Sequence, residues 1–124
     1  MIGYTSLGTN DLSRAALFYD ELLKLLDGKR MMEMDDFIVW SDMNTTSPGF
    51  SVHLPVDGKP ASIGNGVMIA LSASNPALVD TVYQKAIELG AKDEGKPGPR
   101  GDTGFYAAYF RDLDGNKLNV HYLP

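Results

Sequence analysis

The two histidines of the chain, His53 and His121, are its most versatile chemical groups, and each ends a similar tripeptide. These tripeptides are Ser51-Val52-His53 and Asn119-Val120-His121. Both alternate like a strand, so each histidine is expected on the same sheet face as the residue two positions earlier. An imidazole can act as a general base or bind a divalent metal. His53 and His121 are therefore candidate catalytic residues, and the alternative is that both are ordinary residues near strand ends.

Two more candidates precede His121 in the chain. Arg100 lies in the turn-rich segment Gly98-Pro99-Arg100-Gly101-Asp102, where its guanidinium could bind a carboxylate or phosphate or could simply be a solvated loop charge. Tyr109 belongs to a group of strand aromatics that either pack in the core or form the wall of a ligand pocket. We include both residues among the candidate ligand-binding groups.

The first half of the chain predicts a strand, an amphipathic helix and then further strands. Apolar residues spaced by three and four run from Leu12 to Leu26, which predicts a helix capped by Asn10 or Asp11. Gly28 is expected to be the left-handed residue that ends this helix. The other predicted elements are a strand over Gly3–Gly8, a hairpin of strands Met31–Met34 and Phe37–Trp40, a polar loop over Asn44–Gly49 and a strand over Phe50–Leu54.

The same order begins again after a linker rich in turn formers, Val56–Gly66. Asn75 and Pro76 predict the start of a second helix, which Gly90 ends. The segment Ala91–Gly104 contains two prolines and four glycines, so we predict that it is mostly loop. The other predicted strands are Val67–Ala73, Phe105–Arg111 and Lys117–Tyr122, with a tight turn over Asp114-Gly115-Asn116 between the last two.

An internal repeat links the two halves. Leu7 lies 64 residues before Leu71, and His53 lies 68 residues before His121. A longer loop before the last two strands would account for the difference. We therefore predict a single α+β domain over residues 1–124, built from two tandem βαβββ modules at about 1–57 and 64–124 joined by a linker at about 56–66. The modules are expected to form a curved mixed sheet with a concave cavity.

The composition excludes several classes of function. The chain carries a net charge of −5 and no basic run longer than Lys29-Arg30, which argues against nucleic-acid binding. It contains no cysteine, which excludes disulfides, thiol nucleophiles and Cys-type zinc sites. It shows no signal-peptide pattern and no apolar run long enough to cross a membrane. We expect a cytoplasmic protein without a nucleic-acid or membrane partner.

The chain resembles the glyoxalase / bleomycin-resistance / extradiol-dioxygenase superfamily, also called the vicinal oxygen chelate (VOC) family. The resemblance covers essentially the whole chain, and the acidic turn near the C-terminus is its most specific motif. The residues that carry it are Asp11-Leu12-Ser13-Arg14, Phe18-Tyr19, Gly64-Asn65-Gly66, Val79-Asp80-Thr81-Val82-Tyr83 and Arg111-Asp112-Leu113-Asp114-Gly115-Asn116-Lys117.

The resemblance also implies where a metal would be bound. Family enzymes hold a divalent ion with His and Glu side chains from four strands, and the equivalent positions here are Tyr4, Ser51, Met68 and Asn119. Ser and Met are poor ligands for such an ion, and Tyr and Asn are weak ones. We therefore expect no cofactor, and the alternative is a divalent metal on an unusual set that includes His53 and His121.

These expectations favour a protein that binds a small organic molecule in the cavity without a metal. The candidate ligand-binding residues are Tyr4, Ser51, His53, Met68, Arg100, Tyr109, Asn119 and His121. The alternative is a glyoxalase-like lyase or isomerase, either metal-dependent through an unusual ligand set or metal-free. The resemblance also implies a homodimer.

Overall fold

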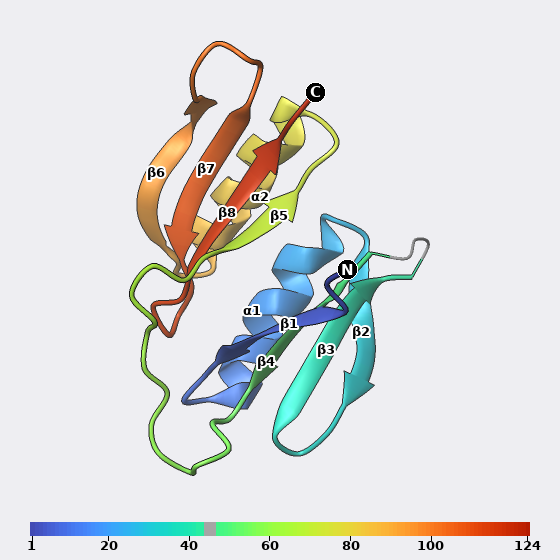
Figure 1. Ribbon diagram of the computed structural model, residues 1–124, viewed down its shortest axis with the longest axis vertical. Coiled ribbons are helices and arrows are strands. Elements are labelled where there is room, and N and C mark those ends of the chain that lie inside the picture. Colours follow the sequence, from blue (N-terminus) through green and yellow to red (C-terminus); the bar gives the residue numbers. More distant parts are fainter. Residues whose placement is uncertain (44–46) are drawn as a thin grey trace. The chain divides into compact units, whose positions relative to one another are not determined.

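A computed structural model describes residues 1–43 and 47–124, so part of the predicted loop Asn44–Gly49 lies outside the described residues. The chain forms two compact units, Met1–Ile63 and Gly64–Pro124, which we call module one and module two. Their boundary lies inside the predicted linker. Each module contains a strand, a helix and three more strands (Figure 1). The elements are β1 (Tyr4–Gly8), α1 (Leu12–Lys24), β2 (Gly28–Glu33), β3 (Phe37–Asp42), β4 (Gly49–His53), β5 (Ile69–Ser72), α2 (Pro76–Glu88), β6 (Lys92–Pro99), β7 (Tyr106–Arg111) and β8 (Lys117–Tyr122).

Module one is a four-stranded mixed sheet in the order β1-β4-β3-β2, with α1 against one face (Figure 1). Asp11 caps α1, because its carboxylate accepts a hydrogen bond from the backbone N–H of Arg14. The aromatic rings of Tyr19, Trp40 and Phe50 pack against one another between helix and sheet. Trp40 therefore points to the helix.

Module two repeats this plan with the sheet order β5-β8-β7-β6 and α2 against one face (Figure 1). Asn75 caps α2 through the N–H of Leu78, and Pro76 occupies the first turn, as predicted. Gly90 has a φ of 104°, which confirms that it ends the helix in the left-handed region. Among residues 1–43 and 47–124, no helix has the length and apolar character that a membrane crossing requires.

The strand register confirms the sequence repeat. In module one, Leu7 of β1 pairs with Val52 of β4. In module two, Leu71 of β5 pairs with Val120 of β8. Both partners are related by the predicted offsets of 64 and 68 residues. The two α+β modules are therefore tandem copies of one βαβββ unit.

The prediction of a loop over Ala91–Gly104 was wrong, because Lys92–Pro99 forms the strand β6. β6 is an edge strand, and its pairing with β7 is interrupted by register shifts around Gly95 and Gly98. Proline and glycine are tolerated at edges and bulges, where a missing N–H or side chain breaks little of the ladder. The prolines and glycines of this segment therefore belong to an irregular edge strand.

The end of the first helix was also assigned to the wrong residue. Asp27, with a φ of 62°, is the left-handed residue, and Gly28 already begins β2. A Cβ on Gly28 would lie 3.0 Å from the Cβ of Leu23, so glycine is needed there for close approach of strand and helix. The strand predicted over Val67–Ala73 is shorter than expected, which leaves Met68 just before β5.

The acidic motif near the C-terminus forms the turn between β7 and β8. The Asp112 carboxylate accepts hydrogen bonds from the backbone N–H groups of Asp114 and Asn116. It also accepts one from the side-chain amide of Asn116 at 3.0 Å. Asp112 and Asn116 are buried, so the motif positions β8 and the residues on it.

Candidate functional site

Each sheet has one face against its helix and one face away from it, which we call the far face. In module one, Trp40 donates to Asp20 of α1, so Trp40 and its strand partner Phe50 lie on the helix face. Side chains alternate along a strand, so Val52, two residues after Phe50, also lies on the helix face. Ser51 and His53 therefore lie on the far face. Their register partners place Tyr4 and Ser6 of β1 there too. The far face of module one thus carries Tyr4, Ser6, Val39, Ser51 and His53.

The polar groups on this face are hydrogen-bonded to each other or to the backbone. His53 Nδ1 lies 2.6 Å from Ser6 Oγ. Ser51 Oγ donates to the backbone oxygen of Thr5 at 2.7 Å, and Ser51 is only 2% exposed. Tyr4, by contrast, is 68% exposed. His53 therefore has the Ser6 hydroxyl as its partner, and the Ser51 hydroxyl, at a predicted ligand position, is bound to the backbone of β1.

The far face of module two carries the equivalent residues of β8 and their neighbours on β7. Tyr109 pairs with Asn119, and Ala107 pairs with His121. His121 Nδ1 and Asn119 Oδ1 are hydrogen-bonded at 3.1 Å, and the His121 ring lies 5.4 Å from that of Phe105. Asn119 is 3% exposed. Met68 precedes β5 and is 39% exposed, so it lies outside the sheet.

Arg100 joins the far face of module two although it follows β6 in the chain. Its guanidinium carbon lies 5.6 Å from the centroid of the Tyr109 ring. Its Nη1 donates to the Gly98 oxygen at 2.8 Å, and its Nη2 donates to the Lys96 oxygen at 2.7 Å. These contacts hold the guanidinium beside the Tyr109 ring.

The structure adds two residues that the sequence analysis missed. Ser6 is the partner of His53, and Lys117 places its ammonium 5.6 Å from the Tyr109 ring centroid. The period of two along each strand could have placed both on the same face as a predicted site residue. Ser6 lies two residues after Tyr4, and Lys117 lies two residues before Asn119.

One ion pair borders the far face of module two. Arg111 Nε donates to Glu94 at 2.8 Å, and Arg111 Nη1 donates to the oxygen of Gly115. The hydrogen bond from Arg111 keeps the pKa of Glu94 below its ordinary value. Glu94 therefore stays ionised at neutral pH and compensates Arg111.

The other shifted groups lie on the helix faces. Hydrogen bonds from Arg30 lower the pKa of Asp20, and Trp40 donates to the same carboxylate. Burial raises the pKa of Tyr83, whose hydroxyl donates to Asp93. The hydrogen bond to Asp80 raises the pKa of Tyr106. Each of these contacts ties a helix or a neighbouring strand to its own sheet, so we assign them to stability.

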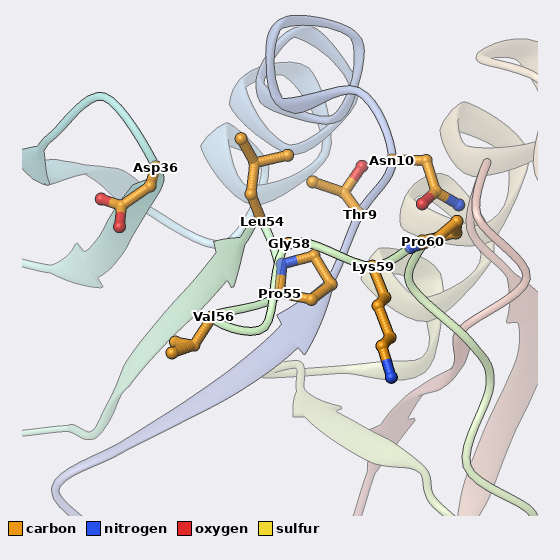
Figure 2. Close-up of a pocket in the computed structure, with 9 residues that line it drawn as sticks. All are labelled: Thr9, Asn10, Asp36, Leu54, Pro55, Val56, Gly58, Lys59 and Pro60. Atoms are coloured by element: carbon orange, nitrogen blue, oxygen red, sulfur yellow. The ribbon is translucent and has the colours of Figure 1, made fainter.

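A pocket of about 550 Å³ lies in module one beside the start of the linker (Figure 2). The backbone N–H of Ala61 donates to Asn10 at 2.6 Å, which holds the linker against the segment between β1 and α1. Most of the lining residues are exposed, and none is a predicted site residue. They are Thr9, Asn10, Asp36, Leu54, Pro55, Val56, Gly58, Lys59 and Pro60. We favour the far faces as the candidate site, because they hold the fixed polar and cationic side chains.

Comparison with known proteins decides the family. The sequence profile of the Glyoxalase/Bleomycin resistance protein/Dioxygenase superfamily matches residues 1–120. The chain belongs to this superfamily. The match covers both modules of the fold described above. Among curated proteins, none matches the chain.

Solved structures of the superfamily share the fold. A glyoxalase/bleomycin resistance protein from Albidiferax ferrireducens T118 is 30% identical, with a TM-score of 0.90 over 100% of this chain and 99% of that one. A family enzyme from Burkholderia phytofirmans PsJN is 15% identical, with a TM-score of 0.76 over 98% of both chains. Lactoylglutathione lyase from Agrobacterium tumefaciens is 20% identical, with a TM-score of 0.70 over 98% of this chain and 92% of that one. The last two similarities concern the fold alone.

The four positions where the superfamily resemblance implies metal ligands do not fit a divalent ion. The Ser51 hydroxyl and the Asn119 amide are buried and hydrogen-bonded within their own modules. Met68 offers a thioether, a soft ligand, and Tyr4 a phenol. Within residues 1–43 and 47–124, no group of three or more His, Cys, Asp or Glu side chains is arranged to hold a metal. No metal-dependent step follows from this set of residues.

Proposed function

We propose that this VOC protein binds a small organic molecule on the far faces of its sheets and that its binding requires no metal. The observation that carries the proposal is that Ser51 and Asn119 form hydrogen bonds within their own modules. Both occupy predicted ligand positions, yet Ser51 Oγ donates to the Thr5 backbone and Asn119 Oδ1 is bonded to the His121 ring. The same faces present an imidazole, a phenol and a fixed guanidinium, which suit hydrogen bonding and stacking with an organic ligand.

Two measurements on the purified chain test this proposal. Native mass spectrometry would detect a co-purified small molecule, and elemental analysis would measure bound Zn, Ni, Fe and Mn. We expect a ligand mass and less than stoichiometric metal. A stoichiometric transition metal that is needed for ligand binding would overturn the metal-free part. Failure of a broad set of small molecules to perturb any far-face resonance in NMR would overturn the binding part.

The contact between Ser6 and His53 favours an enzyme as the second candidate. A histidine hydrogen-bonded to a hydroxyl has a fixed ring orientation, as a general base requires. The matching activity is a glyoxalase-like lyase or isomerase that moves a proton next to a carbonyl. Turnover of methylglyoxal–thiol adducts, measured with and without added Ni or Zn, distinguishes it from a binding protein. Activity that His53→Gln abolishes would favour the enzyme.

We also propose that the chain is a cytoplasmic homodimer. The absence of cysteine agrees with a reducing compartment. Methionines exposed along and beside the edge strand β2 support the dimer, because this flexible side chain adapts to protein surfaces. They are Met31, Met32, Met34 and Met43. Sedimentation equilibrium at micromolar concentration tests the dimer, and a single monomeric species would contradict it.

A further inference from the structure

We infer that the far face of module two selects small organic anions, with Arg100 and Lys117 holding a ligand carboxylate beside the Tyr109 ring. This inference rests on the proposed function and names its ligand class. It concerns module two alone and requires three side chains from three neighbouring segments. Arg100 follows β6, Tyr109 lies in β7 and Lys117 begins β8.

The Arg100 guanidinium is held in place before any ligand arrives. Nη1 donates to the oxygens of Gly98 and Pro99, at 2.8 and 3.3 Å, and Nη2 donates to Lys96 at 2.7 Å. Within the described part of the chain, Nε donates no hydrogen bond. Backbone carbonyls orient the group but leave its full positive charge uncompensated. A fixed guanidinium loses little side-chain entropy on binding, which favours affinity.

The local charge is opposite to that of the whole chain. Arg100 and Lys117 each lie 5.6 Å from the Tyr109 ring centroid, and Arg111 is the next cation on this face. The carboxylate of Glu94 forms its ion pair with Arg111, whose hydrogen bond is the main cause of its lowered pKa, and it interacts with Lys117 only through space. Arg100 and Lys117 form no ion pair among residues 1–43 and 47–124. A site with two cations on a protein of net charge −5 indicates selection of an anion.

Two glycines make the room that this arrangement needs. A Cβ on Gly95 would lie 3.1 Å from Tyr109 Cδ2 and 3.4 Å from Arg100 Nη2. A Cβ on Gly98 would lie 3.2 Å from Arg100 Nη1. Any larger residue at either position would crowd the ring or the guanidinium. The glycines of β6, which made its sequence look like a loop, thus leave space for Arg100 beside Tyr109.

The test is a ¹H–¹⁵N NMR titration of the full chain with sodium benzoate and with benzyl alcohol, at matched ionic strength. We expect benzoate to shift the amides of Ala107, Tyr109 and Asn119 and the Arg100 Nε signal. Benzyl alcohol should bind about tenfold more weakly, because it lacks the charge that Arg100 and Lys117 bind. Equal affinity for the two probes would overturn the anion inference and leave the proposed binding function intact. A titration in which neither probe shifts these signals would also overturn the anion inference. It would not overturn the proposed binding function, which fails only if no molecule of the broad NMR screen perturbs a far-face resonance.

Variants separate the charge from its position. Arg100→Gln is expected to weaken benzoate about tenfold, and Lys117→Gln less, since a flexible ammonium acts as a point charge. Arg100→Lys, which keeps the charge but loses the carbonyl contacts, should fall between Arg100→Gln and the unchanged chain. Lys85→Gln on α2 removes the same charge from the opposite side of module two and should change affinity less than about twofold. Unchanged benzoate affinity in Arg100→Gln, with a spectrum that shows a folded chain, would overturn the inference.

Discussion

Ser6 Oγ and His53 Nδ1 lie 2.6 Å apart, on neighbouring parallel strands whose register pairs Ser6 with Ser51. The contact is therefore diagonal across β1 and β4, and both side chains lie on the far face of module one. In module two the equivalent of Ser6 is Ala70, which has no hydroxyl. His121 instead uses Asn119, its neighbour along the same strand. The two copies thus fix equivalent imidazoles with different partners.

Replacing Ser6 by alanine should free the His53 ring at a small cost in stability. The hydrogen bond is exposed, so we expect Ser6→Ala to lower the free energy of unfolding by only about 0.5 kcal/mol. Nitrogen NMR of the ring should show one tautomer in the unchanged chain and a mixture in the variant, with the first pattern restored by Ser6→Thr. Ser62→Ala, in the exposed linker, is the control. The same ring spectrum with and without the Ser6 hydroxyl would contradict the assignment.

Replacing Asp20 by asparagine should destabilise module one in a pH-dependent way. Its carboxylate accepts hydrogen bonds from Arg30 and Trp40, and Arg30 lowers its pKa below the ordinary 3.8. The contact therefore stabilises the fold above pH 4 or so, and this stabilisation is lost as the pH falls through the lowered pKa. Asp20 and Arg30 are each about one-third exposed, so we expect about 1 kcal/mol at pH 7.

Urea unfolding followed by the fluorescence of Trp40, the single tryptophan, measures this effect. The difference between Asp20→Asn and the unchanged chain should shrink on acidification to about pH 3. Glu21→Gln removes the same charge from the exposed side of α1 and should have little effect at pH 7. A difference that grows on acidification would refute the role of Asp20.

The sequence predicted the parts of the fold that depend on period and caps. Apolar spacing, Asp11 and Asn75 located both helices, and the repeat offsets predicted that Leu7 and Leu71 occupy equivalent positions in the two modules. β6 was missed because an edge strand with bulges tolerates glycine and proline, which composition assigns to loops. The residue that ends α1 was misassigned because glycine also serves close packing, as at Gly28.

The candidate site was predictable only as far as strand alternation extends. A period of two correctly groups Ser51 with His53 and Asn119 with His121 on the far faces. It cannot show that Arg100 folds back over Tyr109, since that contact depends on carbonyls and glycines of the irregular strand β6. Hydrogen-bond partners across strands, such as Ser6 for His53, require the register as well as the period.

Removing the Asp112 carboxylate should strongly destabilise module two. Asp112 is buried and accepts hydrogen bonds from two backbone N–H groups and from the Asn116 side chain. Asp112→Ala leaves these donors without an acceptor, and we expect a loss of about 2–3 kcal/mol of unfolding free energy. Urea unfolding followed by far-UV circular dichroism measures it. Asp102→Ala, in the exposed turn before β7, should cost much less, and equal effects would show that the turn contacts contribute nothing specific.

Replacing Gly98 by alanine should displace Arg100 without unfolding module two. The added Cβ would lie 3.2 Å from Arg100 Nη1, the end of a flexible side chain that can move away. We therefore expect benzoate affinity to fall about three- to tenfold, while the free energy of unfolding changes by less than about 1 kcal/mol. Gly3→Ala, where a Cβ meets no atom within 4 Å, is the matched control and should leave affinity unchanged. If Gly98→Ala binds benzoate as tightly as the Gly3 variant, the fixed position of Arg100 does not contribute to anion binding.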